Sequence, residues 1–71
     1  MKEYFFVTED DKKEAVVSVE DNGETIVLYY DVIDAHLNDY TGIEDLFESF
    51  EDCKEALTKK GYTKDITGLM F

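Results

Sequence analysis

Carboxylates are the side chains of this sequence that are most able to do chemistry. The chain has 18 Asp plus Glu against 7 Lys, carries no Arg, and has a formal net charge of -11 at pH 7. Residues 31–55 contain nine acidic residues and one lysine, so the middle of the chain holds most of the negative charge. Closely spaced carboxylates attract lysine and arginine, and a regular row of them can imitate a phosphate backbone. Their spacing therefore bears directly on function.

A long helix is predicted to position these carboxylates. Thr41 followed three residues later by Glu44 matches a capping box, and Gly61 supplies a C-terminal stop. The helix is therefore predicted to begin at Thr41 and to end at about Lys60. Apolar residues at spacings of three and four form one stripe along it: Ile43, Leu46, Phe47, Phe50, Cys53 and Leu57.

The face opposite this stripe is predicted to be anionic. At ~100° per residue, four glutamates fall within a narrow arc and two aspartates flank them. Like charges at i,i+4 are unfavourable by ~0.2–0.5 kcal/mol per pair, so helix stability alone does not explain the row. Successive members are about 5–6 Å apart along the axis, which is close to the phosphate spacing of one nucleic-acid strand. The predicted partner-binding residues are Glu44, Asp45, Glu48, Glu51, Asp52 and Glu55.

The N-terminal half predicts an antiparallel sheet. Residues 4–8, 15–20 and 25–30 are rich in aromatic and β-branched side chains, which favour strands. Asn22-Gly23 is typical of a two-residue type I′ hairpin loop. That loop would pair Val19 with Ile26 and Val17 with Leu28 on the core face, and would place Val16, Val27 and Tyr29 on the opposite face.

The predicted fold class is α+β, with a sheet of three to four strands packed against one long helix in the C-terminal half (βββα, or βββαβ). Residues 34–40 are predicted to form a helical turn or an irregular connection. Residues 62–66 and 69–71 suggest a last short strand or an extended segment that returns to the sheet. A chain of 71 residues makes one domain, predicted to span residues 1–71.

No catalytic constellation is evident, and a chain this small offers little core from which to form a cleft, so an enzyme is not expected. No cofactor is predicted. His36 lies near Asp34 and Asp39 in the sequence, but this grouping lacks a recognised ligand spacing, and we expect a surface histidine and no metal. Cys53 falls on the apolar stripe and is expected to be a buried, unreactive thiol.

A second interface is predicted on the tyrosines, of which the chain has five. Tyr29 and Tyr30 are adjacent in a predicted strand and cannot both face the helix. We therefore expect Tyr29, together with Tyr40, to contribute to a secondary surface that suits a homodimer or a partner.

A cytoplasmic protein is expected. Cys53 has no second cysteine with which to form a disulfide, which fits a reducing compartment. No run of 18 or more apolar residues occurs, and the first residues do not resemble a signal peptide, so no contact with a membrane is expected.

In its size, acidity and lack of catalytic residues the chain resembles the class of small phage-encoded inhibitors that mimic DNA. That class includes anti-CRISPR proteins, uracil-DNA glycosylase inhibitors, and blockers of restriction enzymes or nucleoid proteins. The resemblance implies a non-enzymatic inhibitor that binds a basic nucleic-acid-binding protein. Two alternatives remain: an immunity or antitoxin-like protein that binds a toxin by its tyrosine surface, and a small host domain whose acidity serves solubility.

The charge predicts that the protein does not bind nucleic acid directly. A net charge of -11 repels phosphate, and no basic cluster offsets it. A gel-shift titration at ~50 mM salt is therefore expected to show no saturable complex with DNA or RNA. Saturable binding without a bridging cation would contradict this prediction.

Overall fold

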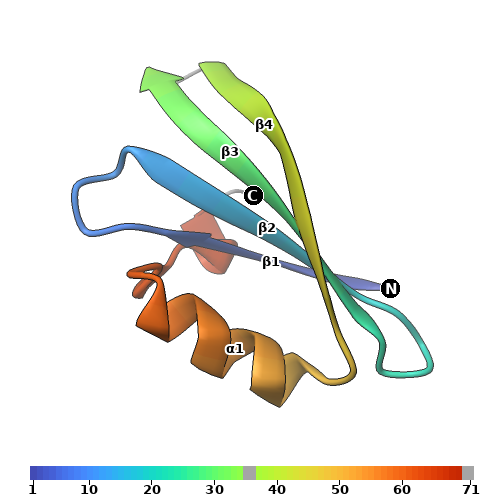
Figure 1. The fold of residues 1–71 in the computed structure, drawn as a ribbon. Coiled ribbons are helices and arrows are strands. Elements are labelled where there is room, and N and C mark those ends of the chain that lie inside the picture. The colour runs from blue at the N-terminus through green and yellow to red at the C-terminus, as the bar shows by residue number, and fades with distance from the viewer. Residues whose placement is uncertain (35–36, 70–71) are drawn as a thin grey trace.

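A computed structural model describes residues 1–34 and 37–69 of the chain. Five strands form one antiparallel sheet in the order β4-β3-β2-β1-β5, and α1 lies across one face of this sheet (Figure 1). The fold is α+β, as predicted, with more strands and a shorter helix than expected. In chain order the elements are β1 (Lys2–Val7), β2 (Lys13–Val19), β3 (Thr25–Asp34), β4 (Leu37–Phe47), α1 (Phe50–Lys59), β5 (Lys64–Asp65) and the 3₁₀ helix η1 (Thr67–Leu69).

The β2–β3 hairpin closes with a three-residue loop. Glu20 N–H donates to the carbonyl of Glu24 at 2.9 Å, and Gly23 N–H donates to the carbonyl of Glu20 at 2.9 Å. Gly23 has φ 91°, which only glycine adopts without steric cost. This is the type I turn followed by a left-handed residue that three-residue hairpins use, so the predicted two-residue loop is wrong.

The longer loop shifts the hairpin register by one residue. Val19 pairs with Thr25 and Val17 pairs with Val27, so the predicted pairs of Val19 with Ile26 and Val17 with Leu28 are wrong. Because side chains alternate between the two faces, the shift turns Val27 and Tyr29 towards α1. Cys53 is buried, as predicted. The buried core consists of Phe6, Ala15, Val17, Val27, Tyr29, Cys53, Leu57 and Tyr62.

Residues 37–47 form strand β4 and not the first half of a helix. Gly42 has φ 81°, which is incompatible with an α-helix. Thr41 does not cap a helix, because its Oγ1 donates to the carbonyl of Tyr29 at 2.8 Å. The register between β3 and β4 shifts at this point: Leu28 pairs with Glu44, whereas Tyr30 pairs with Tyr40. The extra residues of β4 form a bulge around Gly42.

The helix begins after Ser49 and ends where the sequence predicts. Ser49 Oγ accepts a hydrogen bond from Asp52 N–H at 3.2 Å, which satisfies one of the first-turn donors. At the other end, Gly61 has φ 95° and Tyr62 N–H donates to the carbonyl of Leu57 at 2.9 Å. This is the hydrogen-bond pattern of a Schellman motif, and it confirms the predicted stop at Gly61.

Two shorter segments, residues 34–40 and residues 62–71, lie on either side of the helix region. Residue 34 and residues 37–40 belong to β3 and β4, so the predicted helical turn or irregular connection is wrong there, and residues 35–36 lie outside the described residues. The predicted last strand is present as β5, which pairs with β1. Leu69 belongs to the 3₁₀ helix η1, so the predicted extended segment is wrong at that residue, and residues 70–71 also lie outside the described residues. Within the described part of the chain, no helix is long and apolar enough to span a membrane.

Ser49, as the N-cap of α1, is expected to contribute to the stability of the protein. Ser49→Ala removes the acceptor for Asp52 N–H and is expected to lower the free energy of unfolding by about 1 kcal/mol in urea denaturation. Ser49→Asp, which keeps a capping oxygen, is the control and is expected to be nearly neutral. Equal stability of the wild type and Ser49→Ala would contradict the assigned helix start.

Candidate functional site

The predicted row of carboxylates is divided among three parts of the chain. Glu44 and Asp45 lie in β4, Glu48 lies in the bend that follows, and the remaining three lie in α1. The predicted single anionic helix face is therefore wrong. Glu51 and Glu55 still lie one helical turn apart. Any acidic binding surface must consequently be assembled by the tertiary fold and not by one helix.

Asp45 is bound within the protein. Its Oδ2 accepts a hydrogen bond from the Tyr29 hydroxyl at 2.6 Å and one from Lys60 Nζ at 2.9 Å. The Tyr29 hydroxyl, and then Lys60, hold the pKa of the Asp45 carboxyl below its ordinary value. Asp45 therefore joins β3, β4 and the end of α1, and its charge is compensated within the protein by Lys60.

Acidic residues gather at one end of the sheet. Thr25 pairs with Phe47, which brings the β2–β3 hairpin beside the β4–α1 connection (Figure 1). Glu24 and Glu48 line one shallow hollow of about 350 Å³ between these segments. We name the six carboxylates of residues 20–24 and 46–52 the acidic end: Glu20, Asp21, Glu24, Glu48, Glu51 and Asp52.

The acidic end has little local compensation. Neither of its two segments contains a lysine, and five of its six side chains are exposed, with Glu20 partly buried. Among the described residues, these six carboxylates form one ion pair, between Asp21 and the N-terminal amine at 3.4 Å. Uncompensated carboxylates create a negative field that attracts cationic groups. Lysines form ion pairs elsewhere: Lys59 with Glu55, Lys60 with Asp45 and Lys64 with Asp11.

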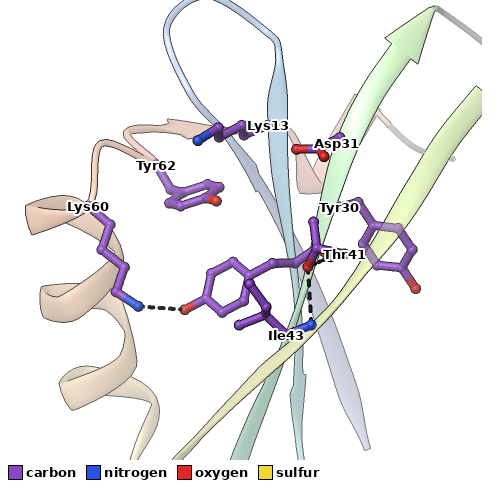
Figure 2. A pocket seen from close by; sticks show the side chains of 8 residues that line it. Lys13, Tyr30, Asp31, Thr41, Ile43, Lys60 and Tyr62 are labelled. Atoms are coloured by element: carbon purple, nitrogen blue, oxygen red, sulfur yellow. Dashed lines mark hydrogen bonds between the residues drawn. The ribbon is translucent and has the colours of Figure 1, made fainter.

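A second concave region lies beside Asp45. Figure 2 shows Lys60 and Tyr62, from the C-terminal end of α1 and the residues after it, across from Thr41 and Ile43 of β4. This pocket has a volume of about 310 Å³. Lys60 Nζ lies 3.3 Å from the Tyr29 hydroxyl and is paired with Asp45, whereas Lys13 and Asp31 line the pocket on its other side.

Tyr29 lies against this pocket as a structural residue. Its ring centroid lies 5.6 Å from that of Tyr62. Burial, reinforced by the hydrogen bond to the Asp45 carboxylate, raises the pKa of Tyr29 to about 12. The hydroxyl is therefore neutral at physiological pH and acts as a hydrogen-bond donor.

The two tyrosines predicted to share a secondary interface differ in exposure. Tyr29 is 6% exposed, so its predicted place on an open surface is wrong. Tyr40 is 46% exposed, and its ring centroid lies 5.3 Å from that of Tyr30. The hairpin register explains the difference, because it places Leu28 and Tyr30 on the sheet face away from α1.

Other reactive groups do not form a site. Burial raises the pKa of the Cys53 thiol to about 11, so the thiol is protonated at neutral pH. Within residues 1–34 and 37–69, no three His, Cys, Asp or Glu side chains are grouped as metal ligands. His36, expected on the surface near Asp34 and Asp39, lies outside the described residues.

Three residues of the acidic end were missed by sequence reasoning: Glu20, Asp21 and Glu24. The sequence predicts Glu20 at the end of a strand and Asp21 and Glu24 in the hairpin turn, all far in sequence from the predicted helix. Residues 43–47 read Ile-Glu-Asp-Leu-Phe and do not alternate apolar with polar side chains, so no local pattern in the sequence marks them as a strand. The strand that forms there pairs with β3 and returns its C-terminal end to the hairpin.

The chain was compared with protein-family models, with curated proteins and with solved structures, and none of the three comparisons found a match. Its fold and its acidic end are therefore interpreted from its own residues.

The Asp45 hydrogen bonds predict a defined acid sensitivity. The pKa of Asp45 is lower in the folded protein than its ordinary value of 3.8. The ionised carboxylate therefore stabilises the fold at pH values above 3.8, and this contribution is lost as the pH falls through the lowered pKa. Asp45→Asn is expected to lower the free energy of unfolding at pH 7 by about 1 kcal/mol and to weaken the loss of stability below pH ~4.

The control for this prediction is Tyr29→Phe, which removes only the hydroxyl. A double-mutant cycle in urea at pH 7 is expected to give a coupling between Tyr29 and Asp45 of about 0.5–1 kcal/mol. Purely additive effects, or an unchanged acid limb in Asp45→Asn, would show that the carboxylate is not held as described.

Proposed function

We propose that this protein is a small, non-enzymatic inhibitor that mimics the charge of DNA and occupies the nucleic-acid-binding surface of a basic protein. The observation that carries this proposal is the acidic end, where the pairing of β3 with β4 brings together six carboxylates from two distant segments, neither of which contains a lysine. A protein that needs acidity only for solubility gains nothing from separating the two signs of charge.

Electrostatics supports this use of the acidic end. Glu24 and Glu48 face one hollow, and like charges placed close together disfavour the folded state. A basic groove that normally receives phosphates offers lysine and arginine to relieve that repulsion. Binding would then neutralise both surfaces and exclude the nucleic acid by competition.

The form of the mimicry differs from a regular phosphate row. The carboxylates come from a hairpin, a bend and the first turn of α1, so they form a cluster at one end of the sheet. Glu44 on β4 and Glu55 on α1 extend from this cluster along the two elements that meet there. Such a cluster supports a compact basic cleft as the target, of the kind found in DNA-processing enzymes. Inhibitors of CRISPR effectors, restriction enzymes or DNA glycosylases, often encoded by phages, are the functional class that we propose.

The alternative of an immunity or antitoxin-like protein relied on a tyrosine surface. Burial of Tyr29 leaves Tyr30 and Tyr40 as the pair on the sheet face away from α1. An acidic end without lysines is the stronger feature of the molecule, and it favours a basic nucleic-acid-binding partner.

Removal of charge from the acidic end tests the proposal. The protein is used as bait, and binding of the recovered basic partner is measured by calorimetry at two salt concentrations. Glu48→Gln combined with Glu51→Gln is expected to weaken binding about tenfold or more at low salt, because two exposed carboxylates leave the interface. Thermal stability is expected to change little, because the relief of repulsion between like charges is offset by the loss of Glu51 from the first turn of α1, where a carboxylate is favourable.

The matched control is Asp31→Asn combined with Asp39→Asn. These two exposed aspartates pair across β3 and β4 nearer the other end of the sheet, and the double variant removes the same net charge. If both double variants weaken binding equally, overall charge and not the acidic end determines affinity. If neither variant affects binding, charge mimicry is excluded.

A further inference from the structure

The β4 edge of the sheet is unusually apolar. β4 is the outermost strand in the order β4-β3-β2-β1-β5, and it pairs with β3. Six large hydrophobic side chains are strongly exposed among the described residues, and five of them belong to β4 or to the end of β3 beside it. These five are Ile33 (59%), Leu37 (55%), Tyr40 (46%), Ile43 (60%) and Leu46 (67%).

The half of β4 that leads to the acidic end is a regular edge. Glu44–Phe47 pairs with Thr25–Leu28 without interruption. An edge strand presents main-chain N–H and C=O groups on its open side, and these groups can pair with an added strand. Natural edges are commonly protected by bulges, and here the bulge at Gly42 lies outside this stretch.

Exposed apolar side chains beside this edge would be buried by an added strand. Leu46 pairs with Ile26 on the face away from α1, whereas Ile43 lies beside the pocket at Lys60 on the helix face. An extended segment against β4 would therefore meet an exposed apolar side chain on each face. Apolar contacts supply affinity that solvated ion pairs do not.

Charge identifies the kind of strand that fits. β4 contains Asp39, Glu44 and Asp45 and no lysine, and it ends at the acidic end. A second copy of this chain would bring like charges together across the new pair, which is destabilising. A strand with lysine or arginine beside it would instead be attracted by Glu44 and the acidic end.

The geometry points to the Glu44–Phe47 edge of β4, with Ile43 of the adjoining bulge beside it, as a docking site for an extended segment of a basic protein, which joins the sheet by main-chain hydrogen bonds. Ile43 and Leu46 contact its apolar side chains, and the acidic end contacts its flanking cations. The charge of the partner rests on the proposed function, whereas the strand pairing rests on the edge itself.

Two synthetic peptides separate pairing from charge. The probe is a short peptide of alternating valine and threonine flanked by lysine pairs, and its match carries N-methyl groups on alternate strand residues, so that charge is kept and main-chain donors are lost. The probe is expected to slow amide exchange within residues 43–47 and to bind about tenfold more tightly than its N-methylated match. Binding is followed by amide chemical shifts.

Protein variants locate the site. Ile43→Thr combined with Leu46→Thr keeps β-propensity and is expected to weaken probe binding about tenfold. The control, Ile33→Thr combined with Leu37→Thr, removes a similar but somewhat smaller exposed apolar area and is expected to leave probe binding unchanged. Thermal melting checks that each variant is folded.

The outcomes distinguish the two proposals. Equal binding of both peptides, with shifts confined to the acidic end, overturns strand docking and leaves the acidic inhibitor intact. Binding of neither peptide at low salt counts against both proposals. A dimer of the protein alone, seen by sedimentation at physiological salt and lost in Ile43→Thr/Leu46→Thr, overturns the basic partner in favour of a second copy.

Discussion

The rest of the sheet depends on the hairpin loop that Gly23 closes. A positive φ at this residue permits a three-residue loop, and that loop sets Val17 opposite Val27. A slip of one residue would exchange the two faces of β3 relative to β2. In the observed register, Val27 and Tyr29 both face α1, and Tyr29 meets the carboxylate that joins β4 to the end of the helix. The β2–β3 loop therefore determines which side chains enter the core and which line the pocket beside Asp45.

The same register determines where charge is placed. Because β3 begins at Thr25 opposite Phe47, the acids of the hairpin meet those of the β4–α1 connection. Other acidic residues are used within the chain: Asp45 is held by Tyr29 and Lys60, and Glu14 is buried, with Asn38 donating to its carboxylate at 2.6 Å. Burial raises the pKa of Glu14, whereas the hydrogen bonds of Asp45 lower its pKa. The carboxylates of the acidic end are used less within the fold: Asp21 pairs with the N-terminal amine, and Glu51 and Asp52 lie in the first turn of α1, where negative charge is favourable. Their density and exposure are why a partner is inferred for them.

Local signals in the sequence predicted much of this fold, and non-local pairing accounts for what they missed. Gly61 ended the helix as predicted, Cys53 was correctly placed in the core, and the Asn22-Gly23 hairpin was found, because each depends on neighbouring residues. The predicted start of the helix was wrong, although Thr41 and Glu44 match a capping box, because Gly42 between them has a positive φ that a helix does not allow. The predicted register of the hairpin was wrong because an Asn-Gly pair is compatible with more than one loop length. Of the acidic end, only Glu48, Glu51 and Asp52 could be predicted from the sequence. The acids of residues 20–24 join them only because residues 37–47 form a strand that pairs with β3.

The molecule combines an exposed anionic end with an apolar edge that leads to it, and together they suit a basic surface that has lost its nucleic acid. The central claim is that this protein and nucleic acid compete for one site. The most direct test is a titration of the captured partner with the protein at rising concentrations of the nucleic acid that the partner binds. The account predicts that the apparent Kd of the protein rises in proportion to the nucleic acid, with no ternary complex. A ternary complex with an unchanged Kd would contradict it.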